Sequence, residues 1–144
     1  MGMDERDPFA RLRELSEPGA ILDPELLANL IEALPDAIFV VDARAVIRLV
    51  NAAAELLFGY HRAALHGQPI HMLLPPDLRE KHAAHVQRFF MDPRPRPMGF
   101  GLVLKGQHQN GQDIPLEINL NPIMTRQGLY AVAAVRRRRD DPAT

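Results

Sequence analysis

The chain has 144 residues, of which 47% are hydrophobic and 24% charged, and this balance suits one domain with a single apolar core. Its formal net charge of −1 gives no electrostatic reason to expect nucleic acid or an anionic membrane as a partner. The absence of cysteine excludes disulfides, thiolate nucleophiles and cysteinyl cofactor adducts. Since the sequence has neither a signal-peptide core nor the roughly 18 apolar residues of a membrane span, we expect a cytoplasmic protein.

The N-terminal part is expected to precede the main domain as two segments. Residues 1–22 form an extension that is partly helical or mobile, and residues 23–34 form a flanking helix, since Asp23 is an N-cap residue followed by proline at the first helical position. An apolar stripe on this helix consists of Leu26, Leu27, Leu30, Ile31 and Leu34. The stripe packs either on its own domain or on a second copy of the helix. We favour the second interpretation and predict a homodimer interface there.

The chain then changes from helical to β periodicity. Two apolar, β-rich runs at 37–41 and 46–50 are separated by a short turn, which predicts an antiparallel hairpin. Asn51 is expected to cap a short helix that ends at Gly59, and further helical turns are expected between residues 62 and 74.

A longer helix is expected over residues 75–90, followed by a proline-rich loop. Alternating apolar residues then predict three strands, at 98–105, 114–120 and 129–136. The helices are thus grouped between the second and third strands. This order predicts an α+β fold, in which the helices cover one face of an antiparallel sheet.

Four stretches of the sequence resemble the PAS domain family. They are DAIFVVD (36–42), IRLVNAAAELLFGY (47–60), GQPIHMLLP (67–75) and GQHQNGQDIPLEINLNPI (106–123). The resemblance implies a PAS fold, with a five-stranded antiparallel sheet, helices on one face and an N-terminal amphipathic flanking helix. It places the PAS domain at residues 35–137 and leaves a charged tail at 138–144. Two departures are the turn DARAVI, which lacks the usual glycine, and the C-terminal VRRRRDDP.

The resemblance implies a sensory or signal-transduction module. Such a domain binds a small ligand or mediates dimerisation, and it relays the signal to a partner or to an effector domain such as a histidine kinase. Catalysis would then lie in a fused or partner domain rather than in this chain. The ligand is not identified by the fold, although photosensing through a flavin–cysteinyl adduct is excluded because the chain has no cysteine.

The segment REKHAAHVQRF (79–89) contains two histidines three residues apart on the long predicted helix. On a helical wheel His82 lies in the middle of the apolar face, whereas His85 lies at its edge and nearer to solvent. The two side chains are therefore expected to differ in role. A zinc ion shared between them lacks a third ligand nearby in sequence, since His61, His66, His71 and His108 all lie on separate elements.

This helix also resembles that of the haem-binding PAS domains of FixL-type oxygen-sensor kinases. The resemblance implies that His82 is an axial ligand of haem iron, if haem is bound, and that Arg88 lies near a haem propionate. On the distal side the family places an arginine where this chain has Leu102, so a hydrogen bond to bound oxygen would be missing. The predicted pocket consists of His82, Arg88, Leu102, Met98, Phe89 and Phe100.

Two other interpretations remain open. His82 is an ordinary core histidine if it bonds a backbone carbonyl or water. A small α+β enzyme would need a general base in a pocket, and beside His82 the sequence offers only Glu55 and Glu117, which are both expected to be exposed.

Overall fold

The computed structural model describes residues 14–17, 23–96 and 104–139. It divides into two compact units, residues 1–33 and 34–144. The first unit contains α2 (Pro24–Ala33). The second contains, in chain order, β1 (Ala37–Val41), β2 (Ile47–Val50), α3 (Ala52–Phe58), α4 (Arg62–Leu65), the 3₁₀ turns η1 (Ile70–Leu73) and η2 (Pro76–Leu78), α5 (Arg79–Met91), β3 (Leu104–Gln107), β4 (Asp113–Thr125) and β5 (Gly128–Arg137).

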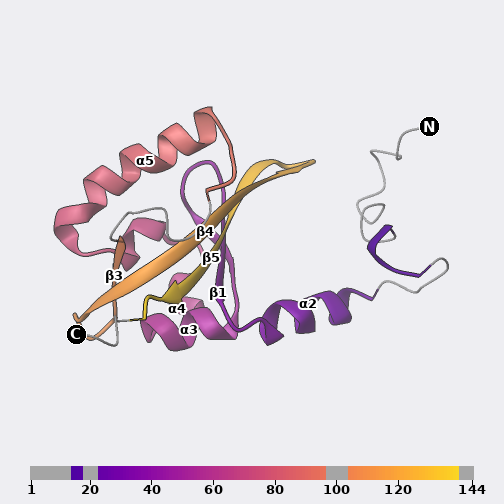
Figure 1. Cartoon of the computed structure of the whole chain (residues 1–144), viewed down its shortest axis with the longest axis horizontal. Coiled ribbons are helices and arrows are strands. Elements are labelled where there is room, and N and C mark those ends of the chain that lie inside the picture. Colours follow the sequence, from indigo (N-terminus) through magenta and orange to yellow (C-terminus); the bar gives the residue numbers. More distant parts are fainter. Residues whose placement is uncertain (1–13, 18–22, 97–103, 140–144) are drawn as a thin grey trace. The chain divides into compact units, whose positions relative to one another are not determined.

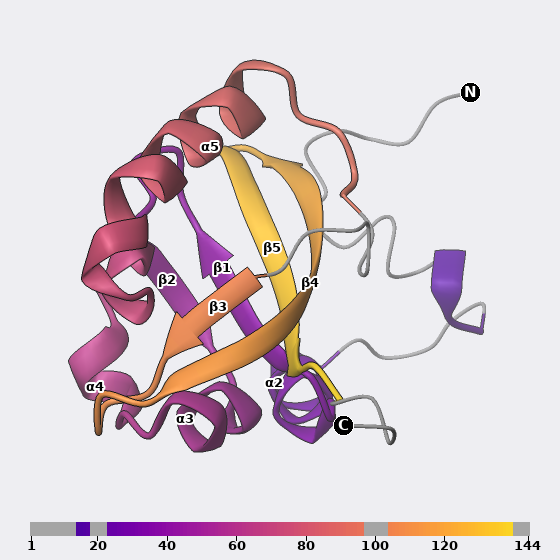
Figure 2. The same ribbon diagram turned by 60° about the vertical axis from the view of Figure 1, so that its left-hand side comes forward.

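The second unit is one antiparallel sheet with helices on one face (Figures 1 and 2). Its strand order is β2-β1-β5-β4-β3, so β1 and β5 lie beside each other although they are at opposite ends of the domain sequence. In the register of this central pair, Phe39 lies opposite Ala133 and Val41 opposite Ala131. The predicted α+β class, the five antiparallel strands and the grouping of the helices are confirmed.

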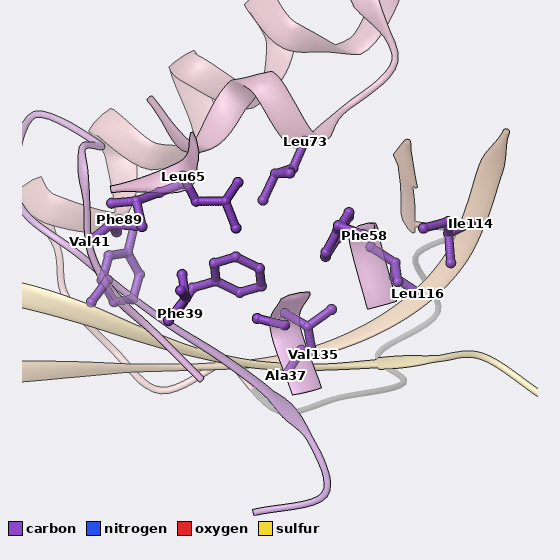
Figure 3. Close-up of a cluster of buried hydrophobic side chains, with 14 residues drawn as sticks. Ala37, Phe39, Val41, Phe58, Leu65, Leu73, Phe89, Ile114, Leu116 and Val135 are labelled. Carbon is purple, nitrogen blue, oxygen red and sulfur yellow. The ribbon is translucent and has the colours of Figure 1, made fainter. Parts of the chain in front are cut away.

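The core lies between the sheet and the helices, and both layers contribute side chains to it (Figure 3). Phe39 of β1 and Phe58 of α3 meet edge to face, with ring centroids 5.6 Å apart. Burial of such rings is the largest source of stability in a domain of this size. The other large buried side chains include Ile47, Leu65, Leu73, Phe89, Ile114 and Leu116.

The β1–β2 turn compensates for the missing glycine with a carboxylate. Ala45 takes the left-handed conformation, with φ 65°, which residues other than glycine seldom adopt. Oδ1 of Asp42 accepts hydrogen bonds from the amides of Arg44 (2.9 Å) and Val46 (3.0 Å), and Oδ2 pairs with Arg48 at 2.8 Å. Burial by itself raises the pKa of Asp42, but these hydrogen bonds outweigh it and lower the pKa below its usual value. The ionised carboxylate therefore holds the turn closed.

Asn51 joins the sheet to the helical layer. Its side chain is fully buried, with an exposed fraction of 0%. Oδ1 accepts hydrogen bonds from the amide of Ala54 at 3.1 Å, which caps α3, and from the amide of Ile38 at 2.8 Å, which lies in β1. Nδ2 donates to the carbonyl of Asp36 at 3.0 Å. One amide group thus satisfies backbone atoms of two elements that are separate in the sequence and holds them together.

Strand β4 is longer than predicted. It runs from Asp113 to Thr125 and pairs with β5 along most of its length, whereas the alternation predicted residues 114–120. The last five residues of the strand, NPIMT, show no alternation of apolar and polar residues. The two large apolar side chains among them, Ile123 and Met124, are both exposed. Pairing with β5, rather than burial, therefore maintains this part of the strand. The predicted strand at 98–105 is described from Leu104 onward.

Helix α2 forms over Pro24–Ala33, as the N-cap pattern predicts, and the Asp23 side chain accepts a hydrogen bond from the amide of Glu25. None of its residues is buried. Leu26, Leu30 and Leu34 each expose about half of their surface, at 50%, 52% and 46%. The apolar stripe is thus accessible for association. No helix among the described residues combines the length and the apolar character needed to cross a bilayer.

We predict that Asn51→Ala lowers the free energy of unfolding by about 2–4 kcal/mol, because the amides of Ile38 and Ala54 and the carbonyl of Asp36 all lose their partner in the interior. Urea unfolding followed by circular dichroism measures this loss. Gln87→Ala, at an exposed position of α5, is the matched control and should change the free energy by less than about 0.5 kcal/mol. Equal effects of the two variants would contradict the role given to Asn51.

Candidate functional site

The candidate site is built around His82, on the first half of α5. Phe89, two turns later on the same helix, is buried in the core and fixes which face of α5 points toward the sheet. His82 is half-buried on that side, whereas His85 and Arg88 are exposed. The helical wheel therefore predicted correctly that His82 is less exposed than His85. It also placed Phe89 on the apolar face, where the structure has it buried.

His71 approaches His82 from η1. The two Nδ1 atoms are 2.9 Å apart, and the rings meet edge to face with centroids 5.1 Å apart. A hydrogen bond of this length requires one ring to donate its Nδ1–H and the other to accept. Sequence analysis did not predict this pair, because His71 was placed on an element separate from the helix.

The backbone of the β1–β2 region positions η1, and thereby His71. Ile70 donates its amide to the carbonyl of Ala45 at 2.8 Å, and Gly67 donates its amide to the carbonyl of Ile47 at 2.9 Å. These bonds tie the segment before His71 to β2 and to the left-handed turn residue that precedes it. From η1 the chain passes through the two prolines at 75 and 76 into α5, which brings His82 back against His71.

Burial sets the protonation of the pair. It lowers the pKa of His82 to about 4, with smaller contributions from the neighbouring His71 and His85. Burial also lowers the pKa of His71. His82 is therefore a neutral imidazole at pH 7, which is the form that serves as a metal ligand or as a hydrogen-bond relay.

Of the other residues predicted to line the pocket, only Arg88 and Phe89 belong to the part of the chain that the structure describes. Arg88 is exposed and Phe89 is buried next to Phe90, whose ring centroid is 5.4 Å away. Met98, Phe100 and Leu102 lie outside the described residues. The predicted distal wall therefore stays a prediction.

A multi-histidine metal cluster does not form in the described part of the chain, where no three histidine, aspartate or glutamate side chains gather to hold an ion. His82 pairs with His71, and His85 lies on the exposed side of the helix. The sequence did not indicate this arrangement, since residues eleven apart with two prolines between them share no helical face.

The two carboxylates considered as general bases are both engaged in ion pairs. Glu55 accepts from the guanidinium of Arg62 at 2.7 Å and from the amide of the same residue at 2.8 Å. These hydrogen bonds lower the pKa of Glu55. Glu117 pairs with Arg136 at 3.0 Å across β4 and β5. A general base needs a carboxylate that is free to accept a proton, whereas both of these carboxylates are held by arginine partners.

Two surface hollows lie elsewhere in the second unit. The larger has a volume of about 500 Å³, and its lining includes Ala53, Leu56 and Leu57 of α3 and Arg137 of β5. The smaller has about 270 Å³ and lies between the β1–β2 and β4–β5 turns, beside Arg44 and Tyr130. Neither hollow reaches His82, so the histidine pair and the hollows are separate features.

The open five-stranded antiparallel sheet, with its helices grouped on one face, defines the class of the domain as α+β. The family model described as PAS fold matches residues 25–138. The chain therefore belongs to the PAS family, as the four sequence stretches indicated.

Solved structures share this fold. A PAS domain from Colwellia psychrerythraea superposes with a TM-score of 0.67 at 24% identity, covering 79% of this chain and 95% of that one. The PAS domain of nitrogen regulation protein NR(II) from Vibrio parahaemolyticus superposes with a TM-score of 0.63 at 21% identity, covering 78% and 98%.

Signalling proteins are among the sequence relatives. Sensor protein FixL of Bradyrhizobium diazoefficiens is 27% identical over 76% of this chain and 22% of its own length. Oxygen sensor protein DosP of Escherichia coli is 30% identical over 62% of this chain and 11% of its own. Sensory histidine kinase/phosphatase NtrB of Azospirillum brasilense is 43% identical over 39% and 13%. The chain thus spans less than a quarter of the length of these relatives.

We predict that acid destabilises the domain through His82. The folded chain has a pKa of about 4 for this group and the unfolded chain about 6.5, so the unfolded chain binds the proton at higher pH. The free energy of unfolding therefore decreases as the pH falls below 6.5, by up to about 3 kcal/mol once the pH is below 4.

Urea unfolding at several pH values between 7 and 4.5 measures this decrease, in a window above the titration of most carboxylates. His82→Gln should flatten the pH dependence in that window, and His66→Ala, which removes an exposed histidine, should leave it unchanged. A decrease of the same size in His82→Gln would refute the assignment.

Proposed function

We propose that this PAS domain is a cytoplasmic sensory module that binds a small ligand on its helical side and relays the signal to a partner or to an effector domain such as a histidine kinase. The observation that supports it is the neutral, half-buried His82, held by His71 within the helical layer. The names of the relatives FixL, NtrB and DosP describe sensor proteins, which agrees with this role. In this proposal the PAS domain is not itself catalytic, and any catalysis is carried out by the domain or partner that receives the signal.

The relay proceeds through packing. A ligand that binds differently to two arrangements of α5 shifts the population between them. Helix α5 packs on η1 and η2, and Ile70 of η1 is hydrogen-bonded to Ala45 in the β1–β2 turn. A shift of α5 would therefore be felt in the β1–β2 turn, which follows the first strand after α2 in the chain. Paired α2 helices in a homodimer would pass the change to the partner.

Haem is the second candidate, as a specific ligand of the same site. The donor chemistry fits, because a neutral imidazole with one ring nitrogen already hydrogen-bonded is the usual form of a histidine that binds haem iron. Bound haem would supply an iron centre that takes up a diatomic gas or changes oxidation state. His82 would hold this group, and the exposed Arg88 guanidinium is free to meet an acidic substituent at the surface.

We predict that protein from haem-replete cells shows a Soret absorption band in the visible spectrum, and that His82→Ala loses it because the iron loses its axial ligand. His85→Ala is the matched control, since it removes an exposed histidine from the same helix and should retain the band. A wild-type protein without the band after reconstitution with haem would contradict the haem candidate and leave the sensory role to another ligand.

We predict that Leu26→Glu combined with Leu30→Glu raises the dissociation constant of the homodimer at least about 100-fold, because two leucines contribute roughly 3 kcal/mol or more when buried. Sedimentation equilibrium measures the constant. Asn29→Glu adds a charge to the same helix away from the stripe and should leave the constant within a few fold. A wild-type chain that is monomeric at all concentrations would contradict the dimer.

A further inference from the structure

The hydrogen bond between His71 and His82 determines which nitrogen of His82 can bind a ligand. The bond uses Nδ1 of both rings, at 2.9 Å. Among the described residues, neither Nε2 atom has a protein partner. No buried side-chain nitrogen in this part of the chain lacks a partner, so Nε2 of His82 is not sealed away from solvent. Two arrangements of the protons satisfy the bond, and they differ in what this Nε2 presents.

In the first arrangement His82 donates its Nδ1–H to His71, and its Nε2 carries a bare lone pair. His71 then bears its proton on Nε2. In the second arrangement His71 donates, and the Nε2 of His82 carries the proton and cannot bind a metal centre. The choice between the two is therefore a choice between a histidine that is ready to act as a ligand and one that is not.

Desolvation favours the first arrangement. Both rings are partly buried, and the protein encloses the ring of His82 more fully than that of His71, so His82 is the drier ring. Water reaches both Nε2 atoms, but an N–H group with little water around it costs more free energy than a lone pair with little water around it. The first arrangement leaves its free N–H on the wetter ring, where water accepts it. The second would leave the free N–H on the drier ring.

We propose that His71 is a positioning residue for His82: it accepts the Nδ1–H of His82 and so keeps the Nε2 lone pair available to a Lewis-acidic metal centre such as haem iron. The inference rests on the proposed function for its ligand, whereas the proton position is a property of the ligand-free domain. The same bond fixes the plane of the His82 ring, because the edge-to-face contact at 75° limits its rotation.

The effect of such a partner is measurable. Groups that orient a metal-binding histidine through its second nitrogen typically change metal affinity 10–100-fold when they are removed. His71→Leu removes the acceptor while conserving an apolar contact with the helical layer. His71→Asp replaces it with a group that can only accept a hydrogen bond. His66→Ala is the control, because it deletes an exposed histidine of the same domain.

The first experiment determines the proton position in the ligand-free protein. Long-range ¹H–¹⁵N correlation spectra at pH 7.5 distinguish the two neutral forms of each histidine ring. We expect His82 to be protonated at Nδ1 in the wild type, in His71→Asp and in His66→Ala, and to shift toward Nε2 protonation in His71→Leu. Protonation of His82 at Nε2 in the wild type would overturn the inference, as would an unchanged His82 in His71→Leu.

The second experiment titrates each protein with haemin and follows the visible spectrum. We expect the dissociation constant to increase 10–100-fold in His71→Leu and to recover in His71→Asp, with His66→Ala equal to the wild type. Equal affinity of the wild type and His71→Leu would overturn the role of His71 as a positioning residue. If the spectra place the proton on Nδ1 but the wild type binds no haemin, the haem candidate fails and the tautomer assignment stands. The two proposals therefore fail separately.

Discussion

The buried amide of Asn51 is the interaction on which the arrangement of the domain depends. A sheet and a set of short helices have no intrinsic reason to take one relative position, since apolar burial is not directional. The hydrogen bonds of Asn51 are directional and fix the position of α3 on β1, because its two polar side-chain atoms bind the start of α3 and the backbone at the start of β1 at the same time. With α3 fixed on β1, Phe58 meets Phe39, and the core is closed around that ring pair. Leu65, Leu73 and Phe89 of the later helices and turns pack into the same core.

The histidine pair depends on this frame through backbone bonds. The left-handed Ala45 directs its carbonyl to the amide of Ile70, which is the residue next to His71. An ionised Asp42 holds the same turn closed. The position of His71 therefore follows from a turn far away in sequence, and the position of His82 follows from the burial of Phe89. The site therefore lies between two anchors, the β1–β2 turn that holds His71 and the buried Phe89 that orients His82.

Much of the fold could be predicted from local sequence signals, because the signals and the structure act over the same few residues. The strand at 37–41, the cap at Asn51 and the stop at Gly59, which has φ 80°, are examples. The wheel also placed His82 inside and His85 outside, since a helical face is set by periodicity. The wheel could not predict the His71 contact, which depends on the bond between η1 and the β1–β2 turn. Nor could the alternation predict the full length of β4, which pairing with β5 sustains. Contacts of this kind depend on tertiary structure and leave no periodic pattern.

The helices differ in how firmly they are anchored, and this difference bears on how a signal could leave the site. Helix α3 has two of its seven residues buried and both ends capped, by Asn51 and by Gly59. All thirteen residues of α5 belong to the described part of the chain, yet Phe89 alone is buried and the N-terminal end has no side-chain cap. Elements with few buried contacts open and shift at the lowest free-energy cost. A ligand that engages His82 would therefore act on a helix that is anchored less firmly than α3, while α3 and Asn51 keep the sheet in place.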